Sequence, residues 1–257
     1  MLDKIKDFWE RNPCGVKDAA SFPEGSLGFF EAIDRHRYQG IDFMQRVVKS
    51  DCWSGRKILE VGCGLGEHLL QFAKAGATVH GVDLTERGIK LTNQRFSLCG
   101  HKGLLCVGDA ENLPFGDDYF DFAYAWGILH HTQDPRKAVR EMIRVLKPGG
   151  HVLSMFYHRC SLVALQMWLY YGIGHGKPWR SPSELIAARL ESPGTKVFSR
   201  NETKVMFEGL ENVEVQTIVT RFDTRIGRRF FLPRWVRRFI PSSLGWYIVV
   251  RANKPRK

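Results

Sequence analysis

Short apolar runs alternate with amphipathic segments along the middle of the chain. Runs typical of β-strands begin at Ile58 and occupy residues 78–82, 104–108, 120–126 and 151–157, with helical patterns such as 67–75 and 135–146 between them. Strands that alternate with helices in this way predict a parallel, doubly wound α/β sheet with helices on both faces. Residues that bind a ligand in such a sheet are expected at the carboxyl ends of the strands.

The flanking segments follow other patterns. Residues 1–50 place apolar side chains at mixed spacings of three and four, which predicts an N-terminal helical cap. After the fifth strand we expect an apolar helix at 162–171 and a mobile lid at about 172–198, rich in glycine and proline. Ser199 and Glu202 form the pattern of a capping box, and 213–219 with 246–250 predict an antiparallel strand pair. The domain then covers 51–257, with its core at 55–157.

The first apolar run ends in the sequence ILEVGCGLG, which places glycine at positions 62, 64 and 66. Glycine lets a backbone turn sharply off a strand and lets a ligand lie against peptide N–H groups at the start of a helix. The spacing Gly62-x-Gly64-x-Gly66 differs from the G-x-G-x-x-G of a pyrophosphate cradle. The turn therefore predicts a site for a nucleotide-like cofactor.

Acidic residues follow the next two strands. Asp83 closes the second run about 20 residues past the glycines, where a carboxylate can bind the two hydroxyls of a ribose. Asp109 closes the third run, where a carboxylate could accept a hydrogen bond from an adenine amino group. The glycine turn and the two acids together predict an adenosine-containing ligand.

Five motifs carry a family resemblance. The strings ILEVGCGLG, GVDLT, GDAENLPF, FDFAYAWGILHH and LKPGG resemble, in order and spacing, the class I S-adenosylmethionine-dependent methyltransferases, in particular the small-molecule group with the methyltransferase-11-type domain. The resemblance covers roughly residues 55–157. It implies a Rossmann-like, seven-stranded, mostly parallel sheet with an antiparallel last strand. It also implies methyl transfer from S-adenosylmethionine, with S-adenosylhomocysteine as product and no metal.

The resemblance implies roles for residues at the matching positions. The glycine turn would receive the methionine part of the cofactor, with Glu60 beneath it, and Asp83 would hold the ribose. Asp109 would read the adenine edge together with the Ala110 N–H, and Trp126 would lie beside the methionyl sulfur. The implied cofactor residues are Glu60, Gly62, Cys63, Gly64, Gly66, Asp83, Leu84, Asp109, Ala110, Trp126 and His131.

The acceptor decides whether a base is needed. A phenol, hydroxyl or amine would need proton removal, for which His131, His158 and Tyr157 are the candidates. A carboxylate acceptor is already ionised and needs only a cationic anchor, for which the candidates are Arg35, Arg37 and Arg159, with Tyr38 beside them. Aromatic residues near the expected pocket favour an apolar or lipid-like acceptor.

Two other functions were compared with methyl transfer. A nicotinamide-dependent reductase is disfavoured, because the glycine spacing is wrong and none of the tyrosines has a lysine four positions later. A non-catalytic protein that binds S-adenosylmethionine remains an alternative, since the motifs indicate cofactor binding only.

Composition indicates one globular unit in the cytoplasm. A chain of 257 residues with 44% hydrophobic content can bury one sizeable core. Its six cysteines contain no C-x-x-C pair, so we expect reduced thiols. Charged residues throughout positions 1–15 leave no apolar run of the kind that a secretory signal needs.

Positive charge is concentrated at the end of the chain. Residues 1–150 hold 20 Lys and Arg against 20 Asp and Glu, whereas 221–257 hold 11 basic residues against Asp223 alone. Within 226–240, arginines are interleaved with aromatic and aliphatic residues, which predicts a basic helical insertion at about 221–243, formed as an amphipathic helix pair broken at Pro233.

Four interpretations of this insertion remain open. It can pack on its own domain with a solvated basic face, line the mouth of a pocket for an anionic substrate, contact a membrane surface, or bind nucleic acid. Nucleic acid is the least favoured, since no binding module accompanies the charge. We expect packing beside the substrate entrance, with peripheral membrane contact through 226–240 as the alternative.

Overall fold

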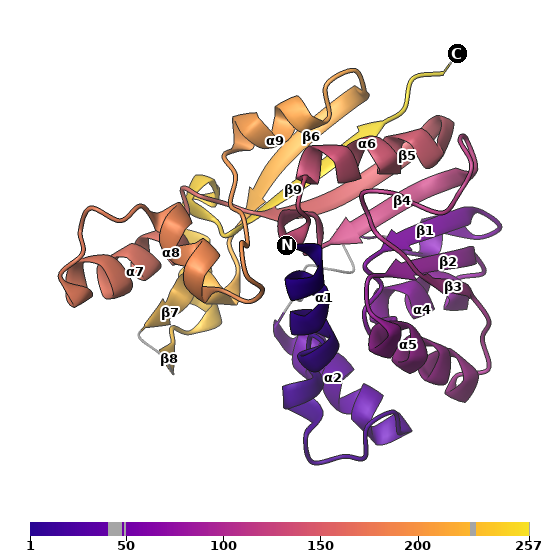
Figure 1. Ribbon diagram of the computed structural model, residues 1–257, viewed down its shortest axis with the longest axis horizontal. Coiled ribbons are helices and arrows are strands. Elements are labelled where there is room, and N and C mark those ends of the chain that lie inside the picture. The colour runs from indigo at the N-terminus through magenta and orange to yellow at the C-terminus, as the bar shows by residue number, and fades with distance from the viewer. Residues whose placement is uncertain (41–47, 49, 227–229, 257) are drawn as a thin grey trace.

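The computed structural model describes residues 1–40, 48, 50–226 and 230–256. In this part of the chain, seven strands form the main sheet in the order β3-β2-β1-β4-β5-β9-β6 (Figure 1). Their bounds are β1 (Lys57–Val61), β2 (Thr78–Asp83), β3 (Leu104–Val107), β4 (Phe120–Trp126), β5 (Leu146–Tyr157), β6 (Glu211–Ile218) and β9 (Tyr247–Asn253). The first five are parallel, and β9 runs antiparallel to β5 and β6. The predicted seven-stranded, mostly parallel sheet with an antiparallel last strand is confirmed.

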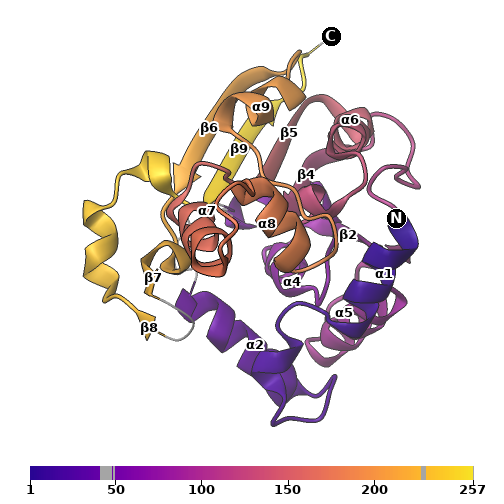
Figure 2. The ribbon, with the colours of Figure 1, turned by 60° about the vertical axis from the view of Figure 1, so that its left-hand side comes forward.

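Helices cover both faces of this sheet (Figures 1 and 2). α4 (Glu67–Lys74) and α5 (Glu86–Leu98) contact one face, and α6 (Pro135–Val145) and α9 (Arg200–Met206) contact the other. Successive side chains of a strand point to opposite faces, so Ile58 joins one core with Leu69 of α4, while Leu59 joins the other with Met142 of α6. Burial on both faces explains why these strands appear as nearly continuous apolar runs.

Helices also precede β1. They are α1 (Leu2–Arg11), a 3-10 turn (Val16–Ala19), α2 (Leu27–Gly40) and a second 3-10 turn (Ser50–Trp53). Phe29 of α2 packs with Leu65 of the glycine turn and Leu91 of α5. The Glu10 carboxylate accepts hydrogen bonds of 3.1 and 3.0 Å from the first two backbone N–H groups of α5. The predicted cap therefore contains helices fixed to the glycine turn and to α5, with residues 41–47 and 49 outside the described part.

A lobe extends from the carboxyl end of β5 (Figures 1 and 2). It begins with α7 (Leu162–Met167), continues through a π-helical turn (Trp168–Gly172) and a 3-10 turn (Ile173–His175), and includes α8 (Pro182–Arg189). α7 and α8 are in contact, and Leu185 and Ile186 of α8 are buried. α9 begins at the capping box of Ser199 and Glu202, as predicted. The segment 172–198 thus contains a packed helix, and its mobility as a lid stays a prediction.

In its described residues, the basic segment before β9 does not form the expected pair of amphipathic helices. It consists of a 3-10 turn (Arg221–Thr224), a hairpin of β7 (Arg225–Ile226) and β8 (Phe230–Phe231), and two further 3-10 turns (Arg234–Phe239 and Ser242–Leu244). Pro233 and Pro241 each precede one of these last turns. Proline has no backbone N–H to donate and interrupts a helix. A helical turn between Pro233 and Pro241 is therefore limited to a few residues.

The aromatic side chains of this segment are exposed rather than covered by the domain. Phe230 is 76% exposed, Trp235 60% and Phe239 65%. The expectation that they pack against the domain is therefore wrong for these three residues. Among the described residues, no helix combines the length and the apolar character needed to cross a membrane.

Candidate active site

A cavity of about 790 Å³ opens at the carboxyl ends of β1, β2, β4 and β5. The glycine turn, α1 and the lobe complete its wall. Ligands of an open α/β sheet bind at this edge, and the volume suits a cofactor together with a small acceptor. The wall contains all but one of the residues predicted to bind the cofactor, namely Glu60, Gly62, Cys63, Gly64, Asp83, Leu84, Asp109, Ala110, Trp126 and His131.

The glycine turn is built so that bare backbone faces the cavity. Gly62 and Gly64 have φ angles of 72° and 53°, in the left-handed region that favours glycine. A Cβ on Gly62 would lie 2.3 Å from Cγ1 of Ile128, whereas a Cβ on Gly64 would meet open space. A ligand can therefore lie directly against the peptide at Gly64. Gly66, also predicted to bind the cofactor, does not line the cavity and instead caps α4.

The Asp83 carboxylate fixes the geometry of this turn. Its Oδ2 accepts a hydrogen bond of 2.8 Å from the Gly64 N–H, and its Oδ1 accepts from the backbone N–H and hydroxyl of Thr85 at 2.9 and 2.6 Å. Burial raises the pKa of Asp83, while these hydrogen bonds oppose the shift. Asp83 thus joins the end of β2 to the glycine turn and to the start of α5, at the cavity wall where a ribose was expected.

A second buried acid lies beneath the turn. Oε1 of Glu60 is 3.7 Å from Nδ1 of His68 on α4, and the same nitrogen is 3.1 Å from the Tyr124 hydroxyl of β4.

The thiol of Cys63 lies within the same turn. Burial, together with the charges of Asp83 and Glu60, raises the pKa of Cys63 well above its usual value, so this thiol stays protonated. Cys63 is therefore a small wall residue and not a nucleophile.

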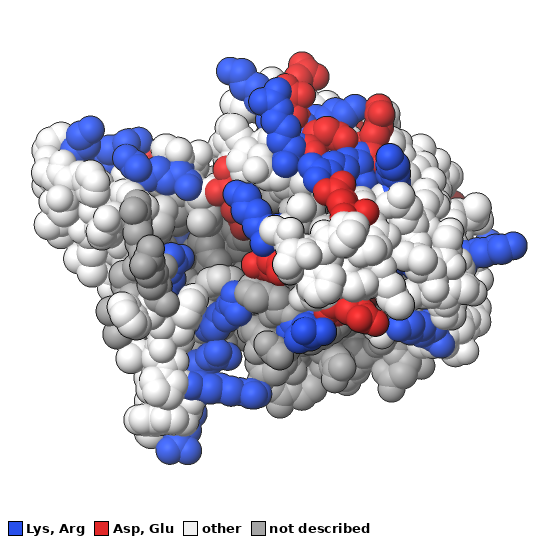
Figure 3. Space-filling view, turned by 90° about the horizontal axis from the view of Figure 1, so that it is seen from below, with Lys and Arg blue, Asp and Glu red and all other residues white. Residues whose placement is uncertain are grey.

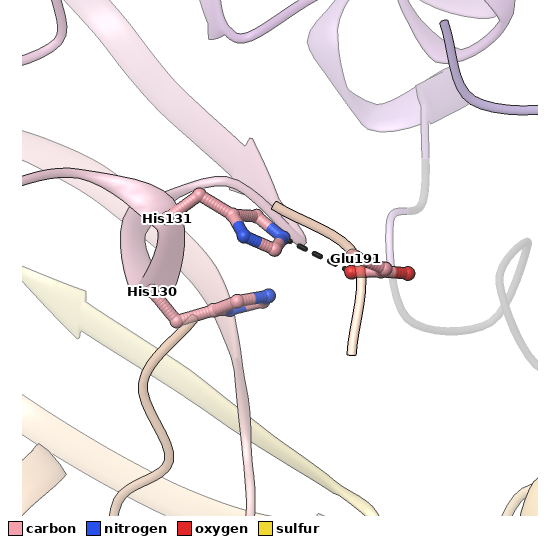
Figure 4. Close-up of side chains that lie close together, drawn as sticks. All are labelled: His130, His131 and Glu191. Carbon is pink, nitrogen blue, oxygen red and sulfur yellow. Dashed lines mark ion pairs between the residues drawn. The ribbon is translucent and has the colours of Figure 1, made fainter. Parts of the chain in front are cut away.

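The acceptor side of the cavity holds a cluster that joins β5, the segment after β4 and the segment after α8. Nε2 of His131 lies 3.1 Å from Oε2 of Glu191 (Figure 4). The Tyr157 hydroxyl donates to the same carboxylate at 3.0 Å, and burial followed by the Glu191 charge raises the pKa of Tyr157 well above its usual value. Tyr157 is thus held as a hydrogen-bond donor, and the hypothesis that it is the base is not supported.

Two hydroxyl groups lie beside the second ring nitrogen of His131. Nδ1 lies 2.8 Å from the Ser192 hydroxyl and 3.1 Å from the Thr195 hydroxyl. The single hydrogen of Thr195 is directed to backbone carbonyls, the nearer being Ser192 O at 2.7 Å, so toward Nδ1 this hydroxyl can only accept, whereas the Ser192 hydroxyl can donate or accept. The other ring nitrogen, Nε2, faces the Glu191 carboxylate.

His130 and His131 differ in their surroundings although both are buried. The His130 ring packs 3.9 Å from the Tyr157 ring, and burial, His131 and Lys196 lower its pKa well below the usual value, so it is neutral. One potential ligand atom from each of His130, His131 and Glu191 lies within 4.8 Å of the others (Figure 4), a geometry that can hold a divalent cation.

The two remaining candidates from the end of β5 do not line the cavity. Nδ1 of His158 contacts the carbonyl oxygen of Gly245 at 3.0 Å, and burial lowers the pKa of His158. The Arg159 guanidinium is paired with Glu202 of the α9 capping box. The structure therefore gives no support to His158 as a base or to Arg159 as an anion anchor, because both side chains contact neighbouring parts of the fold.

The N-terminal anchor candidates also receive no support. Arg35 is exposed and does not line the cavity, and the side chains of Arg37 and Tyr38 lie outside the described part. Basic side chains at the cavity come instead from Arg221, in the 3-10 turn before the hairpin, and from Arg225, the first residue of β7.

Two further wall residues lie outside the motifs: Trp9, one of the aromatic residues expected near the pocket, and Glu191, which was not predicted. Trp9 of α1 packs edge-on against His131, with 5.0 Å between the ring centroids. Glu191 follows α8 with a φ of 53°, an uncommon conformation for a side chain of its size. Neither position has a sequence signal of its own, because each reaches the site only through the packing of the cap and the lobe.

Comparisons with known proteins identify the core. Residues 59–154 match the model of the methyltransferase domain. The uncharacterized methyltransferase YcgJ of Bacillus subtilis is 31% identical over 168 residues, which are 64% of this chain and 63% of that protein. The phthiotriol/phenolphthiotriol dimycocerosates methyltransferase of Mycobacterium leprae is 36% identical over 124 residues, 48% of this chain and 45% of that protein. The matches thus span less than two thirds of these relatives.

The solved structures agree on the fold. A structure of an S-adenosylmethionine-dependent methyltransferase from Thermotoga maritima, described as a possible histamine N-methyltransferase, has a TM-score of 0.60 at 20% identity and covers 97% of this chain and 99% of that one. With the domain match and the glycine turn, this fold assigns residues 59–154 to the class I S-adenosylmethionine-dependent methyltransferase domains.

Proposed function

We propose that the protein transfers a methyl group from S-adenosylmethionine to a hydroxyl or amine of an apolar, lipid-like small molecule in the cytoplasm. The observation that carries the proposal is a single cavity whose wall joins the glycine turn and Asp83 to Glu191 and an apolar surface. When bound, S-adenosylmethionine supplies an electrophilic methyl group on a positively charged sulfur. The protein has to position the two reactants and to manage one proton.

The cofactor half of the cavity fits an adenosine-containing ligand. The open space at Gly64 gives room for the ligand against bare backbone, and Asp83, held by Gly64 and Thr85, offers carboxylate oxygens toward a ribose. Asp109 and Ala110 lie on the same wall at the end of β3, where we infer contact with the adenine. The loop is already ordered by its own hydrogen bonds, which supports binding without large rearrangement.

The acceptor half is largely apolar. Its wall includes Ile5 and Trp9 of α1, Val163 and Met167 of α7, and Leu169 of the following turn. Such a surface favours an apolar acceptor, because burial of apolar area contributes about 25 cal/mol per Å². The mycobacterial relative, by its name, methylates phthiotriol dimycocerosates, which supports an apolar acceptor for the related domain here.

Glu191 is the group that we propose for proton removal. Its carboxylate lines the cavity, is held by the Tyr157 hydroxyl and lies beside His131 Nε2. An acceptor hydroxyl or amine beside this pair can pass its proton to the Glu191 carboxylate as the methyl group is transferred. Base catalysis of this kind contributes typically 10²–10⁴-fold.

A carboxylate acceptor is the second candidate, favoured by the position of two arginines. Arg221 and Arg225 line the cavity, and the Arg221 guanidinium lies over the ring of Phe222 at 5.2 Å. A carboxylate bound to them would be ionised and would need no base. The two candidates differ in their dependence on Glu191, because only a protonated nucleophile needs it.

The test is a panel of apolar phenols, alcohols, amines and carboxylic acids with methyl-labelled S-adenosylmethionine, read as labelled product by mass spectrometry. Transfer to a phenol, alcohol or amine that falls strongly in Glu191→Gln supports the proposal. Transfer to a carboxylic acid that is retained in Glu191→Gln supports the second candidate. Binding of the cofactor with no transfer to any class indicates a non-catalytic binding protein.

A further inference from the structure

The segment 230–239 presents large apolar side chains to solvent. Phe230, Trp235 and Phe239 are each at least 60% exposed, and Phe231 is 46% exposed. Isolated exposed apolar residues are common, but several large ones within ten positions indicate an interaction surface. We call the exposed side chains of this segment the aromatic-arginine patch: Phe230, Phe231, Leu232, Arg234, Trp235, Arg238 and Phe239.

The patch is also strongly basic. Arg234 and Arg238 are exposed, and the Arg238 guanidinium lies over the Phe239 ring at 4.9 Å. The one acid of residues 221–257, Asp223, is buried and accepts hydrogen bonds from the backbone N–H groups of Thr220 and Trp246. The acid within this segment therefore does not offset the charge at the surface. In the view from below in Figure 3, Lys and Arg lie along the hollow together with a few acidic side chains, while Asp and Glu gather mainly on the larger part of the molecule.

The patch is continuous with the cavity wall. Arg221 and Phe222 line the cavity, and the Arg221 guanidinium lies 5.5 Å from the centroid of Phe231. The Leu232 N–H donates to the carbonyl oxygen of Thr224 at 2.8 Å, which fixes the chain after β8 to the turn that forms this wall. Leu169 and Tyr170 belong to the same cavity wall and are both 48% exposed, so part of the wall itself is apolar and open to solvent.

We propose that the aromatic-arginine patch docks the protein on an anionic membrane surface and brings the cavity to the lipid from which the acceptor is taken. The docking does not depend on the proposed methyl transfer. The identity of the acceptor as a membrane lipid does rest on the proposed methyl transfer. Tryptophan and phenylalanine partition into the interface between headgroups and acyl chains, and arginines beside them bind the anionic headgroups.

A membrane fits this patch better than nucleic acid does. Nucleic acid is held mainly by contacts to phosphates, whereas four exposed aromatic rings and Leu232 offer an apolar area that a membrane can bury. An anionic bilayer satisfies both the charge and the apolar area of the same short segment.

The test is co-sedimentation of the full chain with phosphatidylcholine vesicles that contain or lack phosphatidylglycerol, at low and at physiological salt. We expect binding to the anionic vesicles only, weakened by salt. The double variant Arg234→Gln/Arg238→Gln should bind about 30-fold more weakly, since each basic residue near the surface contributes about 1 kcal/mol, or about fivefold. The double variant Trp235→Ser/Phe239→Ser should lose the binding that remains at physiological salt.

The matched control is Arg136→Gln/Lys137→Gln, which removes two exposed charges of α6 outside the patch and should bind as the wild type does. All variants change exposed residues, and thermal unfolding and S-adenosylhomocysteine binding will show that each is folded. Absence of wild-type binding to anionic vesicles at low salt overturns the proposal. Equal losses in the control and patch variants also overturn it, because the effect is then one of net charge.

A second measurement separates the membrane from the nucleic-acid interpretation. Brominated lipids should quench Trp235, and the difference between the wild type and Trp235→Phe gives the part due to this residue. Absence of that difference contradicts insertion of the patch. Tighter binding to single-stranded RNA than to vesicles, lost in the same arginine variant, would assign the patch to nucleic acid. Vesicle binding tests the docking, and cofactor binding tests the proposed function. Because the two are measured separately, a negative result in one does not decide the other.

Discussion

Nε2 of His131, just after β4, lies 3.1 Å from Oε2 of Glu191, sixty residues later in the chain. The first residue belongs to a family motif, and the second lies in a segment without one. Ser192 and Thr195 hold the other ring nitrogen, so the segment after α8 contacts both sides of the imidazole. This segment is therefore part of the wall of the site and fixes the orientation of His131.

Replacement of Glu191 should separate chemistry from cofactor binding. We expect Glu191→Gln to lower the rate of methyl transfer to a hydroxyl or amine acceptor by about 10²–10⁴-fold, because the amide cannot accept the proton. Affinity for S-adenosylhomocysteine should change little. Single-turnover rates and calorimetry measure the two quantities.

Glu184→Gln is the control for this variant, since Glu184 is an exposed carboxylate of α8 whose nearest basic partner, Arg180, is 3.7 Å away. It should keep the wild-type rate. A Glu191→Gln enzyme that is as fast as the wild type on a hydroxyl acceptor would show that Glu191 is not the base.

Loss of the Asp83 charge should weaken cofactor binding. Asp83→Asn removes charge-assisted hydrogen bonds, which contribute about 1.5–3 kcal/mol each, so we expect S-adenosylmethionine to bind at least about tenfold more weakly. Part of this loss reflects the contact of Asp83 with the Gly64 N–H, which orders the turn. Calorimetry gives the affinity, and Asp117→Asn at an exposed site is the control. Unchanged affinity in Asp83→Asn would remove Asp83 from the cofactor site.

The Arg159–Glu202 pair should affect stability and not catalysis. The hydrogen bond from Arg159, together with hydrogen bonds from Ser199, lowers the pKa of Glu202 from 4.5 to about 2, so the stabilisation by the charged carboxylate is fully present above about pH 4.5 and is lost as the pH falls toward 2. Both side chains are about 40% exposed, so solvent screening limits the contribution to about 1 kcal/mol. Arg159→Gln should unfold at lower urea concentration at pH 7, and the difference from wild type should shrink below pH 4.5. A large loss of methyl transfer in a folded Arg159→Gln protein would restore Arg159 as an acceptor anchor.

We expect no resident metal, although the ligand geometry at His130, His131 and Glu191 permits one. Both ring nitrogens of His131 already contact protein groups, and Tyr157 donates to the Glu191 carboxylate. Treatment with a chelator should leave the methyl-transfer rate unchanged, and metal analysis of the purified protein should find less than one equivalent. A rate that falls with the chelator and returns with one divalent cation would contradict this.

The fold could be predicted because its strands and turns carry local signals. The apolar runs at β1, β2 and β4 are buried on both faces, and the capping box at Ser199 is a short-range pattern. The structure of the basic segment could not be predicted in this way, because the interleaved arginines and aromatics at 226–240 are compatible with either an amphipathic helix or exposed turns. The prolines at 233 and 241 favour short turns, but no spacing in the segment specifies whether its aromatics are covered.

The cofactor half of the site was predictable and the acceptor half was not. Asp83 ends β2, and Gly64 and Asp109 lie within three residues of the ends of β1 and β3, so the sheet itself carries them to one edge. Glu191 reaches the cavity only because the lobe folds back over that edge, and Arg221 because the turn after β6 contacts α7. Their positions depend on contacts between distant segments, which local periodicity cannot report.

Titration of the purified protein with S-adenosylhomocysteine, in the wild type and in Gly64→Val, tests the central claim most directly. The wild type should bind one equivalent, because the cavity edge at Gly64 is open to a ligand. Gly64→Val should bind much more weakly, since its side chain would occupy that space, while circular dichroism and thermal unfolding report whether the strained variant is folded. No detectable binding by the wild type, or equal affinity in a folded Gly64→Val protein, would contradict the assignment of this cavity to the cofactor.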